Sequence, residues 1–161
     1  MKNKMTEKLF ELAYTDSMTE VQNRNAYEER LKKLRKPNAN ISRITVIVVD
    51  VNGLKEINDS YGHFCGDDAI KSVAKALRNT IGLKADIYRI GGDEFVCISE
   101  SNVLPYISQF KDTIYFINNE KLYNLSVSIG YSRFHEKYSK VIDDIICRAD
   151  EKMYKYKKSK K

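Results

Sequence analysis

Residues 44–51 read ITVIVVDV, an almost unbroken run of apolar and β-branched side chains. β-Branched residues favour an extended backbone, and an apolar run without polar alternation is typical of a strand that is buried on both faces. The run therefore predicts a central strand, and the rest of the chain must supply elements that cover both faces of its sheet. Asp50 is the only charged residue in the run and lies next to its end.

The remaining chain alternates between helical and extended patterns. Apolar residues recur at helical spacing in six segments, and two of three further extended segments flank Gly91 and Gly92. Because glycine accepts the positive φ that tight turns require, we expect a hairpin there. This order predicts an α/β fold of the α+β kind, with a single mixed, mainly antiparallel central sheet covered by helices. The expected helices are residues 6–14, 26–34, 54–58, 67–80, 103–117 and 141–156, and the expected strands are residues 44–51, 86–90, 94–99 and 125–134.

Bulk composition limits the class of protein and its compartment. The chain has 161 residues and 42% hydrophobic content, which fit one folded domain. No stretch approaches the roughly 18 apolar residues that span a bilayer, and the lysine-rich N-terminus lacks the apolar core of a signal peptide. Cys65, Cys97 and Cys147 form no CxxC pair, and the two histidines lie at no zinc-binding spacing. We therefore expect a cytoplasmic chain with reduced thiols and no membrane contact by this segment.

The formal net charge of +6 comes from the C-terminus. Without the six lysines of the last ten residues, the formal charge would be zero. A nucleic-acid-binding protein spreads basic residues over one face, so we expect no nucleic-acid partner. Two interpretations of these lysines remain open: a solvated helix end that complements the negative pole of the helix dipole, or phosphate contacts from one or two of them.

Acidic residues point to a cation site. Asp50 is costly to desolvate unless it pairs, binds a cation or caps the next helix. In residues 91–94, two glycines let a large anion approach the backbone, and the carboxylates of Asp93 and Glu94 could hold a hard cation. If the hairpin lies beside the strand, the three carboxylates converge on one edge and require divalent cations. Such a cluster is suited to metal-assisted phosphoryl or nucleotidyl transfer.

Residues 52–67 add groups that suit a nucleotide. Gly53 breaks the strand and leads into a short helix, whose N-terminal N–H groups can bind phosphate. Asn58 and Asp67 could present an amide and a carboxylate to a base edge, and a carboxylate that accepts from N1–H and the exocyclic amine selects guanine over adenine. Asp67 could equally cap the following helix, and His63 alone is more often structural.

Together these motifs resemble the GGDEF family of diguanylate cyclases, over nearly the whole chain from about residue 9 to residue 161. The family signature is intact at residues 91–95. The family block that runs from a strand-end aspartate to Gly-His-x-x-Gly-Asp matches residues 50–67. Three further family motifs occur at residues 16–24, 128–130 and 148–154, so that all five stand in the order of the family.

The resemblance implies a fold similar to the palm of nucleotidyl cyclases and a magnesium-dependent reaction that joins two GTP molecules into cyclic di-GMP and pyrophosphate. Asp50 and Asp93 would bind Mg²⁺, for which Mn²⁺ is expected to substitute. The Val51 carbonyl and Glu94 would assist at the metal. Asp93 and Glu94 would be the catalytic acids, with Asp93 helping to deprotonate the attacking 3′-hydroxyl.

For the substrate, the resemblance implies that Asn58 and Asp67 read the guanine. Backbone amides near Leu54 and Lys55 would hold the triphosphate. The remaining expected substrate contacts are Gly91, Gly92, His63, Lys157 and Lys161.

The resemblance also implies one GGDEF domain over residues 1–161, with a lead-in helix in residues 1–15 and the catalytic fold in residues 16–161. Each domain would bind one GTP, so the expected partner is a second GGDEF domain in a transient homodimer. Because the chain begins just before the catalytic fold, a sensor domain missing from this segment stays open as a further partner.

The chain departs from the family pattern at three places. Glu20 and Val21 replace a glycine and a leucine of the opening motif, in a structural segment where we expect little effect. Asn52 replaces an acidic residue without removing a proposed ligand. Lys161 stands where the family has arginine, which keeps the charge but loses the bidentate fork.

Many members of the family carry an Arg-x-x-Asp product-binding motif before the signature. The corresponding positions here are Gly82 and Ala85, so we expect no product-inhibition site. Two alternative functions remain: a non-catalytic module that binds GTP or cyclic di-GMP, and a cyclase with a mixed or adenine product. The retained signature acids argue against the first alternative, and Asp67 argues against the second.

Overall fold

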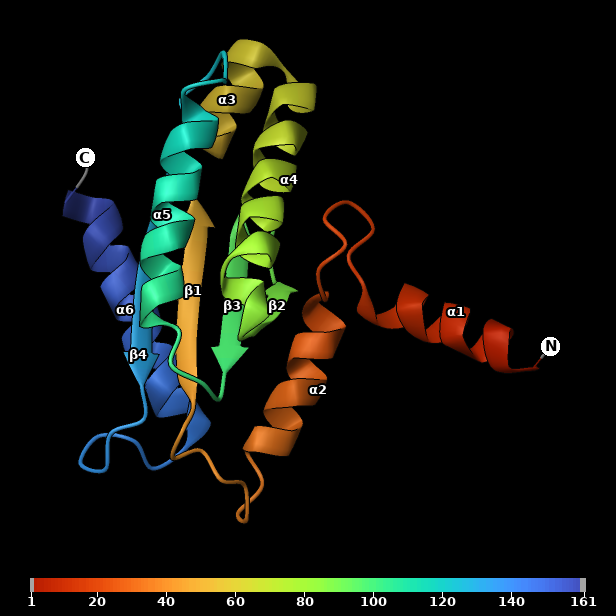
Figure 1. Ribbon diagram of the computed structural model, residues 1–161, viewed down its shortest axis with the longest axis vertical. Helices are drawn as coiled ribbons and strands as arrows, with labels where there is room; N and C mark the ends of the chain where they lie inside the picture. Colours follow the sequence, from red (N-terminus) through yellow and green to blue (C-terminus); the bar gives the residue numbers. More distant parts are fainter. Residues whose placement is uncertain (1, 160–161) are drawn as a thin grey trace.

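β1 (Thr45–Val51) lies inside a four-stranded sheet, between β3 (Glu94–Ser99) and β4 (Val127–Arg133). β2 (Asp86–Arg89) forms the edge beyond β3, and all neighbouring strands are antiparallel (Figure 1). All seven residues of β1 are buried, as the apolar run predicts. The one parallel pairing between described residues is an isolated bridge from Gln22 to β2. The predicted single, mainly antiparallel sheet is therefore confirmed.

The computed structural model describes residues 2–159, with side chains from residue 8 onward. Lys161, a predicted phosphate contact, lies outside the described residues. The helices are α1 (Lys2–Tyr14), α2 (Arg24–Leu34), α3 (Leu54–Tyr61), α4 (His63–Asn79), the short 3-10 helix η1 (Ile81–Leu83), α5 (Leu104–Asn118) and α6 (Ile142–Ser159).

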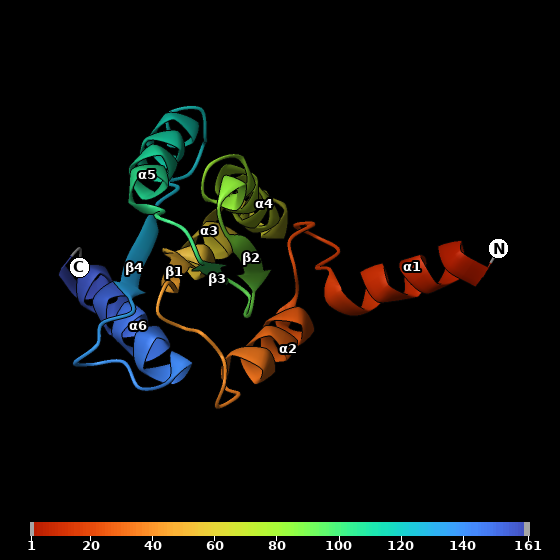
Figure 2. The same ribbon diagram turned by 60° about the horizontal axis from the view of Figure 1, so that its bottom comes forward.

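The alternation of side chains along β1 divides the core in two. Ile47 and Val49 pack with residues of α3, α4 and α5, whereas Val46 and Val48 pack with residues of α2 and α6. Figure 2 shows these two helical layers on opposite sides of the sheet. The covering of both faces explains why β1 carries almost no polar residues.

α6 lies directly against the backbone of β4. Gly130 of β4 is buried, and a Cβ added there would lie 2.1 Å from the Ala149 carbonyl oxygen and 2.2 Å from the Met153 nitrogen. Only a residue without a side chain allows the helix to approach so closely. This packing fixes the position of α6 along the sheet.

α4 begins at His63, four residues before the predicted start. Gly66 lies inside this helix, although glycine is a poor helix former and the sequence pattern placed the start of the helix after it, at residue 67. A Cβ at Gly66 would lie 2.0 Å from Oδ1 of Asn58 in α3, so close packing requires the glycine. The N-cap of α4 is Gly62, and the interpretation of Asp67 as a helix cap is therefore wrong.

The hairpin between β2 and β3 forms as predicted, but not for the predicted reason. Its loop covers residues 90–93, and neither Gly91 nor Gly92 has a positive φ. A Cβ at Gly91 would lie 2.9 Å from Oε2 of Glu94, whereas Gly92 faces open space. Gly91 therefore leaves room for the Glu94 carboxylate, and the expectation of a positive φ was wrong.

α1 projects away from the sheet (Figures 1 and 2). Its side chains Leu9, Phe10 and Leu12 are exposed. None of the described helices combines the length and the apolar character needed to cross a membrane. The three cysteines, all in the described part of the chain, are free thiols, as predicted.

Candidate active site

Three acidic residues gather where β1 meets the β2–β3 hairpin. Asp50 is paired in register with Glu94 of β3, and the Val51 N–H donates to the Asp93 carbonyl oxygen at 3.0 Å. Residues directly opposite each other in an antiparallel pair carry side chains on the same face of the sheet. The hairpin therefore lies beside the central strand, which is the condition that the sequence left open, and it brings Asp93 and Glu94 to Asp50.

The Asp50 carboxylate has a cationic partner from the far end of the chain. The side chain is buried, with 7% of its surface exposed, and Oδ1 accepts a hydrogen bond from Lys157 Nζ at 2.7 Å. Lys157 reaches it from the C-terminal part of α6. Since the N-cap of α3 is Gly53, Asp50 is not a helix cap.

These groups shift one another's protonation. Burial raises the pKa of Asp50; the Lys157 hydrogen bond opposes this, and the charges of Asp93 and Asp150 add to it. Burial and the nearby carboxylates of Asp93 and Asp50 raise the pKa of Glu94. The hydrogen bond to Asp50 raises the pKa of Lys157, so its ammonium stays charged. One lysine thus leaves the acidic group with excess negative charge, which favours binding of a cation.

A cleft of about 670 Å³ lies beside these residues. Its walls come from the turn before α3 and from the loop between α5 and β4. Five of the sequence-predicted site residues line it together, namely Val51, Leu54, Lys55, Asp93 and Lys157.

Sequence reasoning missed two further lining residues, Asn124 and Ser126 of the loop between α5 and β4. Ser126 holds the turn before α3 in place. The Asn52 N–H donates to the Ser126 carbonyl oxygen at 2.9 Å, and Asn52 Nδ2 donates to Ser126 Oγ at 3.1 Å. Ser128 Oγ donates to Asn52 Oδ1 at 2.7 Å. Asn52, noted from sequence only as a replacement for an acidic residue, therefore links the turn to Ser126 and to Ser128 of β4 through hydrogen bonds.

The turn places the start of α3, Leu54 and Lys55, at the lining of the cleft. Gly53 has φ of 64°, a left-handed conformation that favours glycine. It is followed at once by Leu54 and Lys55, whose N–H groups belong to the first turn of α3 and have no partner within the helix. Such groups, like the Lys157 ammonium, are of the kind that bind phosphate in proteins, and their contact with a phosphate here stays a prediction.

The predicted guanine-reading residues lie at the junction of α3 and α4. The Asn58 side chain contacts Gly66, which is the residue before Asp67 in α4. Asn58 and Asp67 are therefore close to each other although they belong to different helices. Asp67 is half-buried, and His63 is exposed at the first position of α4. None of these three residues lines the cleft described above. Their contact with a base stays a prediction.

A sequence profile described as "Diguanylate cyclase, GGDEF domain" matches residues 13–161, which is most of the chain. The chain belongs to the GGDEF family. The protein named "Probable diguanylate cyclase DgcI" of Escherichia coli (strain K12) is 32% identical over 153 residues, which cover 94% of this chain and 33% of that protein. A diguanylate cyclase of Vibrio cholerae serotype O1 is 31% identical over 170 residues, which cover 96% of this chain and 50% of that protein. The chain therefore spans between a third and a half of these two relatives.

Solved GGDEF structures have the same fold. The coiled coil and GGDEF domain of DgcB from Caulobacter crescentus, in complex with c-di-GMP, gives a TM-score of 0.80 at 22% identity, covering 98% of this chain and 87% of that one. Diguanylate cyclase SiaD from Pseudomonas aeruginosa, in complex with its activator SiaC, gives a TM-score of 0.80 at 21% identity, covering 99% and 64%. At these identities the likeness establishes the fold alone.

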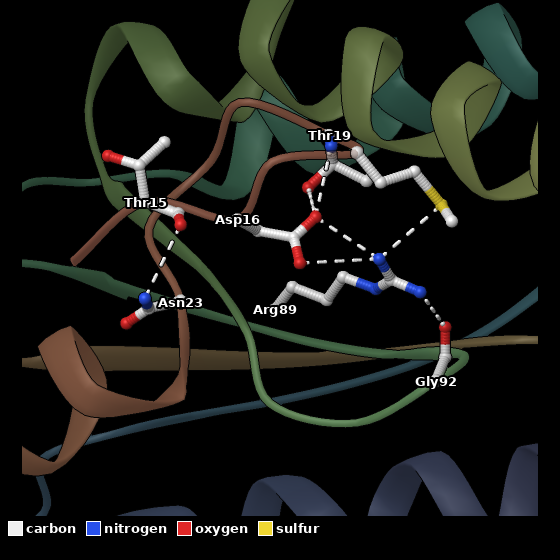
Figure 3. A network of polar contacts seen from close by, with 7 residues as sticks. Thr15, Asp16, Thr19, Asn23, Arg89 and Gly92 are labelled. Atoms are coloured by element: carbon white, nitrogen blue, oxygen red, sulfur yellow. Dashed lines mark hydrogen bonds and ion pairs between the residues drawn. The ribbon is translucent and has the colours of Figure 1, made fainter. Parts of the chain in front are cut away.

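A polar network ties the GGDEF loop to the segment that follows α1 (Figure 3). Arg89, at the end of β2, donates through Nη1 to Asp16 Oδ1 at 3.1 Å and through Nη2 to the Gly92 carbonyl oxygen at 2.8 Å. Thr19 donates to the same carboxylate from its N–H and its hydroxyl. Although burial raises it, the pKa of Asp16 is lowered overall by the hydrogen bonds from Thr19 and Arg89. Arg89 thus stabilises the loop of residues 90–93, which carries Asp93, by linking it to Asp16.

The GGDEF acids fit a hard divalent cation. Their carboxylate oxygens are the donors that such cations prefer, and Mg²⁺ in particular is often held by one or two carboxylates plus substrate phosphates. Among the described residues, no group of three or more His, Cys, Asp or Glu side chains is placed to hold a metal ion. A cation here would therefore have two carboxylates, those of Asp50 and Asp93, and would need further ligands from a substrate or water.

The positions of the family's product-binding motif lie in a shallow depression. Gly82 and Ala85 line it, and Arg78 reaches it from α4. The Arg78 guanidinium donates to Glu20 Oε2 at 2.6 Å. Glu20 belongs to the opening motif and has φ of 60°, a left-handed conformation. The family motif has glycine at this position, and replacing glycine by glutamate in this conformation strains the backbone. The absence of a product-inhibition site stays a prediction.

Proposed function

We propose that this GGDEF domain is the catalytic domain of a diguanylate cyclase, which converts two GTP molecules into cyclic di-GMP and two pyrophosphates. The observation that carries the proposal is the shared cleft, where Asp93 of the signature and Lys157 meet the first turn of α3 beside Asp50. Acidic groups for a cation and N–H and ammonium groups for phosphates in one cleft suit nucleotidyl transfer. The test is identification of the products formed from GTP and Mg²⁺.

In the proposed reaction, Asp50 and Asp93 would hold Mg²⁺, and the ion would supply positive charge next to the phosphates. The Val51 carbonyl and Glu94 assist these ligands. Asp93 accepts the proton of the attacking 3′-hydroxyl. The 3′-oxygen then bonds to the α-phosphorus of the other GTP, and the bond from that phosphorus to the β-phosphate oxygen breaks. Pyrophosphate leaves, and a second such step closes the ring.

In this proposal, residues that line the cleft hold the phosphates of GTP. The N–H groups of Leu54 and Lys55 donate to phosphate oxygens, and Lys157 exchanges part of its contact with Asp50 for a phosphate. Gly91 and Gly92 leave space above the loop for the nucleotide. We expect this reaction to take place in the cytoplasm, where the three free thiols stay reduced.

Asp67 is expected to set the preference for guanine. Its carboxylate accepts from the N1–H and exocyclic amine of guanine, whereas adenine presents a lone pair at N1. Asp67→Asn should therefore raise the Kd for GTP about 10- to 100-fold and leave the weak affinity for ATP nearly unchanged. Calorimetric titration of wild type and variant with each nucleotide measures this. Asp112→Asn, an exposed change on α5, is the control.

Comparable wild-type affinities for GTP and ATP would contradict the assignment of Asp67 as the residue that selects guanine. So would an Asp67→Asn variant whose affinity for GTP is no weaker than that of the Asp112→Asn control.

The proposed reaction needs two domains, because each site binds one GTP. The isolated chain should be mostly monomeric at low concentration, and its specific rate should rise with protein concentration. Well below the dimer dissociation constant, mass action makes the specific rate about proportional to protein concentration. Initial rates over a hundredfold dilution series, with the mass in solution measured by sedimentation, test this. A monomeric sample with a flat specific rate would rule out the two-domain reaction.

A further inference from the structure

A second polar network lies outside the groups assigned to catalysis. Asp68 of α4 accepts a hydrogen bond from Lys121 Nζ at 2.6 Å and another from the Tyr123 hydroxyl. Both donors belong to the loop between α5 and β4, 53 and 55 residues further along the chain. Tyr123 is 5% exposed, and its ring centroid lies 6.2 Å from that of Tyr61 at the end of α3. The loop therefore contacts α4 through Asp68 and α3 through Tyr61.

The loop between α5 and β4 also forms part of the lining of the cleft. Asn124 and Ser126 lie one and three residues after Tyr123, and both line the cleft together with Leu54 and Lys55. Ser126 in turn holds Asn52 through hydrogen bonds. The loop therefore connects the proposed phosphate-binding turn to Asp68, the neighbour of the proposed guanine reader.

The charges of this network favour a lasting contact. Burial would raise the pKa of Asp68, but the hydrogen bonds from Lys121 and Tyr123 lower it overall, so the carboxylate is ionised at neutral pH. Burial, and then the hydrogen bond to Asp68, raise the pKa of Tyr123, so its hydroxyl keeps the proton that it donates. Hydrogen bonds to an ionised acceptor are stronger than those between neutral groups.

We propose that Asp68, acting through Lys121 and Tyr123, is a positioning residue that holds the α5–β4 loop in the conformation to which GTP binds. The identity of the ligand rests on the proposed function. A nucleotide binds only molecules in which the wall is in place, so its apparent affinity falls with the fraction of molecules that have an ordered loop. Asp50 and Asp93 lie outside this loop, and the rate of the chemical step in the GTP-bound protein is therefore retained.

Two substitutions test the proposal. Asp68→Asn removes the charge that pairs with Lys121, and Tyr123→Phe removes the hydroxyl but keeps the ring against Tyr61. In both variants the KM and the calorimetric Kd for GTP should rise about fivefold, the size expected for one lost hydrogen bond, while kcat changes by less than about twofold. Amide hydrogen exchange of residues 119–126 in the nucleotide-free protein should become faster, and saturating GTP should slow it again. Glu120→Gln, an exposed change in the same loop, is the control.

Faster exchange with unchanged affinity for GTP would overturn the positioning role, as would a lower kcat at unchanged KM. Unchanged exchange in both variants would show that Asp68 does not order the loop. If the wild-type chain bound no GTP, the proposed function would fail instead. Exchange in the nucleotide-free protein would still decide whether Asp68 holds the loop.

Discussion

Asp50→Asn and Asp93→Asn are each expected to reduce GTP turnover at least about a thousandfold, equivalent to about 4 kcal/mol of activation free energy. Each change removes one of the two carboxylates proposed to hold the cation, and asparagine offers a neutral oxygen in its place. The fold should survive. Burial raises the pKa of Asp50, so the charged form is disfavoured on folding and a neutral amide relieves that cost. Lys157 loses its partner, but its side chain is 34% exposed and remains solvated.

Steady-state rates with purified variants and their urea-unfolding curves measure both parts of this prediction. Asp150→Asn is the matched control, because Asp150 is an exposed residue of α6 whose charge acts on Asp50 and Glu94 without being a proposed ligand. It should keep its turnover within severalfold of wild type. If both Asp50→Asn and Asp93→Asn kept more than about a tenth of the wild-type rate, the proposed metal site would be wrong.

Gly130→Ala is expected to lower the free energy of unfolding by at least about 3 kcal/mol, at the upper end of overpacking effects. The added methyl group would lie within 2.2 Å of backbone atoms of Ala149 and Met153, which cannot move without shifting α6 along the sheet. A shifted α6 would also carry Lys157 away from Asp50. Turnover should therefore fall even in the fraction of molecules that folds.

Urea unfolding followed by circular dichroism measures the change, with Gly92→Ala as the control for the same substitution in open space. Neither glycine has a positive φ, so the difference between the two variants reports packing alone. Gly92→Ala should cost less than about 1 kcal/mol. A Gly130→Ala protein as stable as Gly92→Ala would contradict the close approach of α6 to β4.

The order of elements could be predicted from the sequence because its strongest patterns are local. The apolar run that became β1 and the apolar spacing in α4, α5 and α6 depend only on neighbouring residues. The start of α4 could not be predicted, because glycine at position 66 is disfavoured in a helix and is required there by Asn58 from α3. The prediction of a positive φ for the hairpin glycines was wrong for a related reason. Glycine is needed at position 91 because the Glu94 side chain lies close to it, and not because a turn type requires it.

The acidic part of the candidate site was predictable because the motif residues follow a strand end and a hairpin, and these elements pair in register. The wall formed by Asn124 and Ser126 was not, since polar residues in an irregular loop are typical of any surface turn. The contact of Asp68 with Tyr123 likewise joins positions 55 residues apart, and only the packed fold brings them together.

The most direct measurement of the central claim is mass identification of the products that the wild-type chain forms with Mg²⁺ and GTP, ATP or both, at a protein concentration high enough for two domains to meet. Cyclic di-GMP and pyrophosphate should form whenever GTP is present, without cyclic di-AMP or a mixed product, and Asp50→Asn should form neither. A mixed product would contradict the role of Asp67. A chain that binds GTP but leaves it unchanged at every protein concentration would be a non-catalytic binding module, and the proposal of a diguanylate cyclase would be wrong.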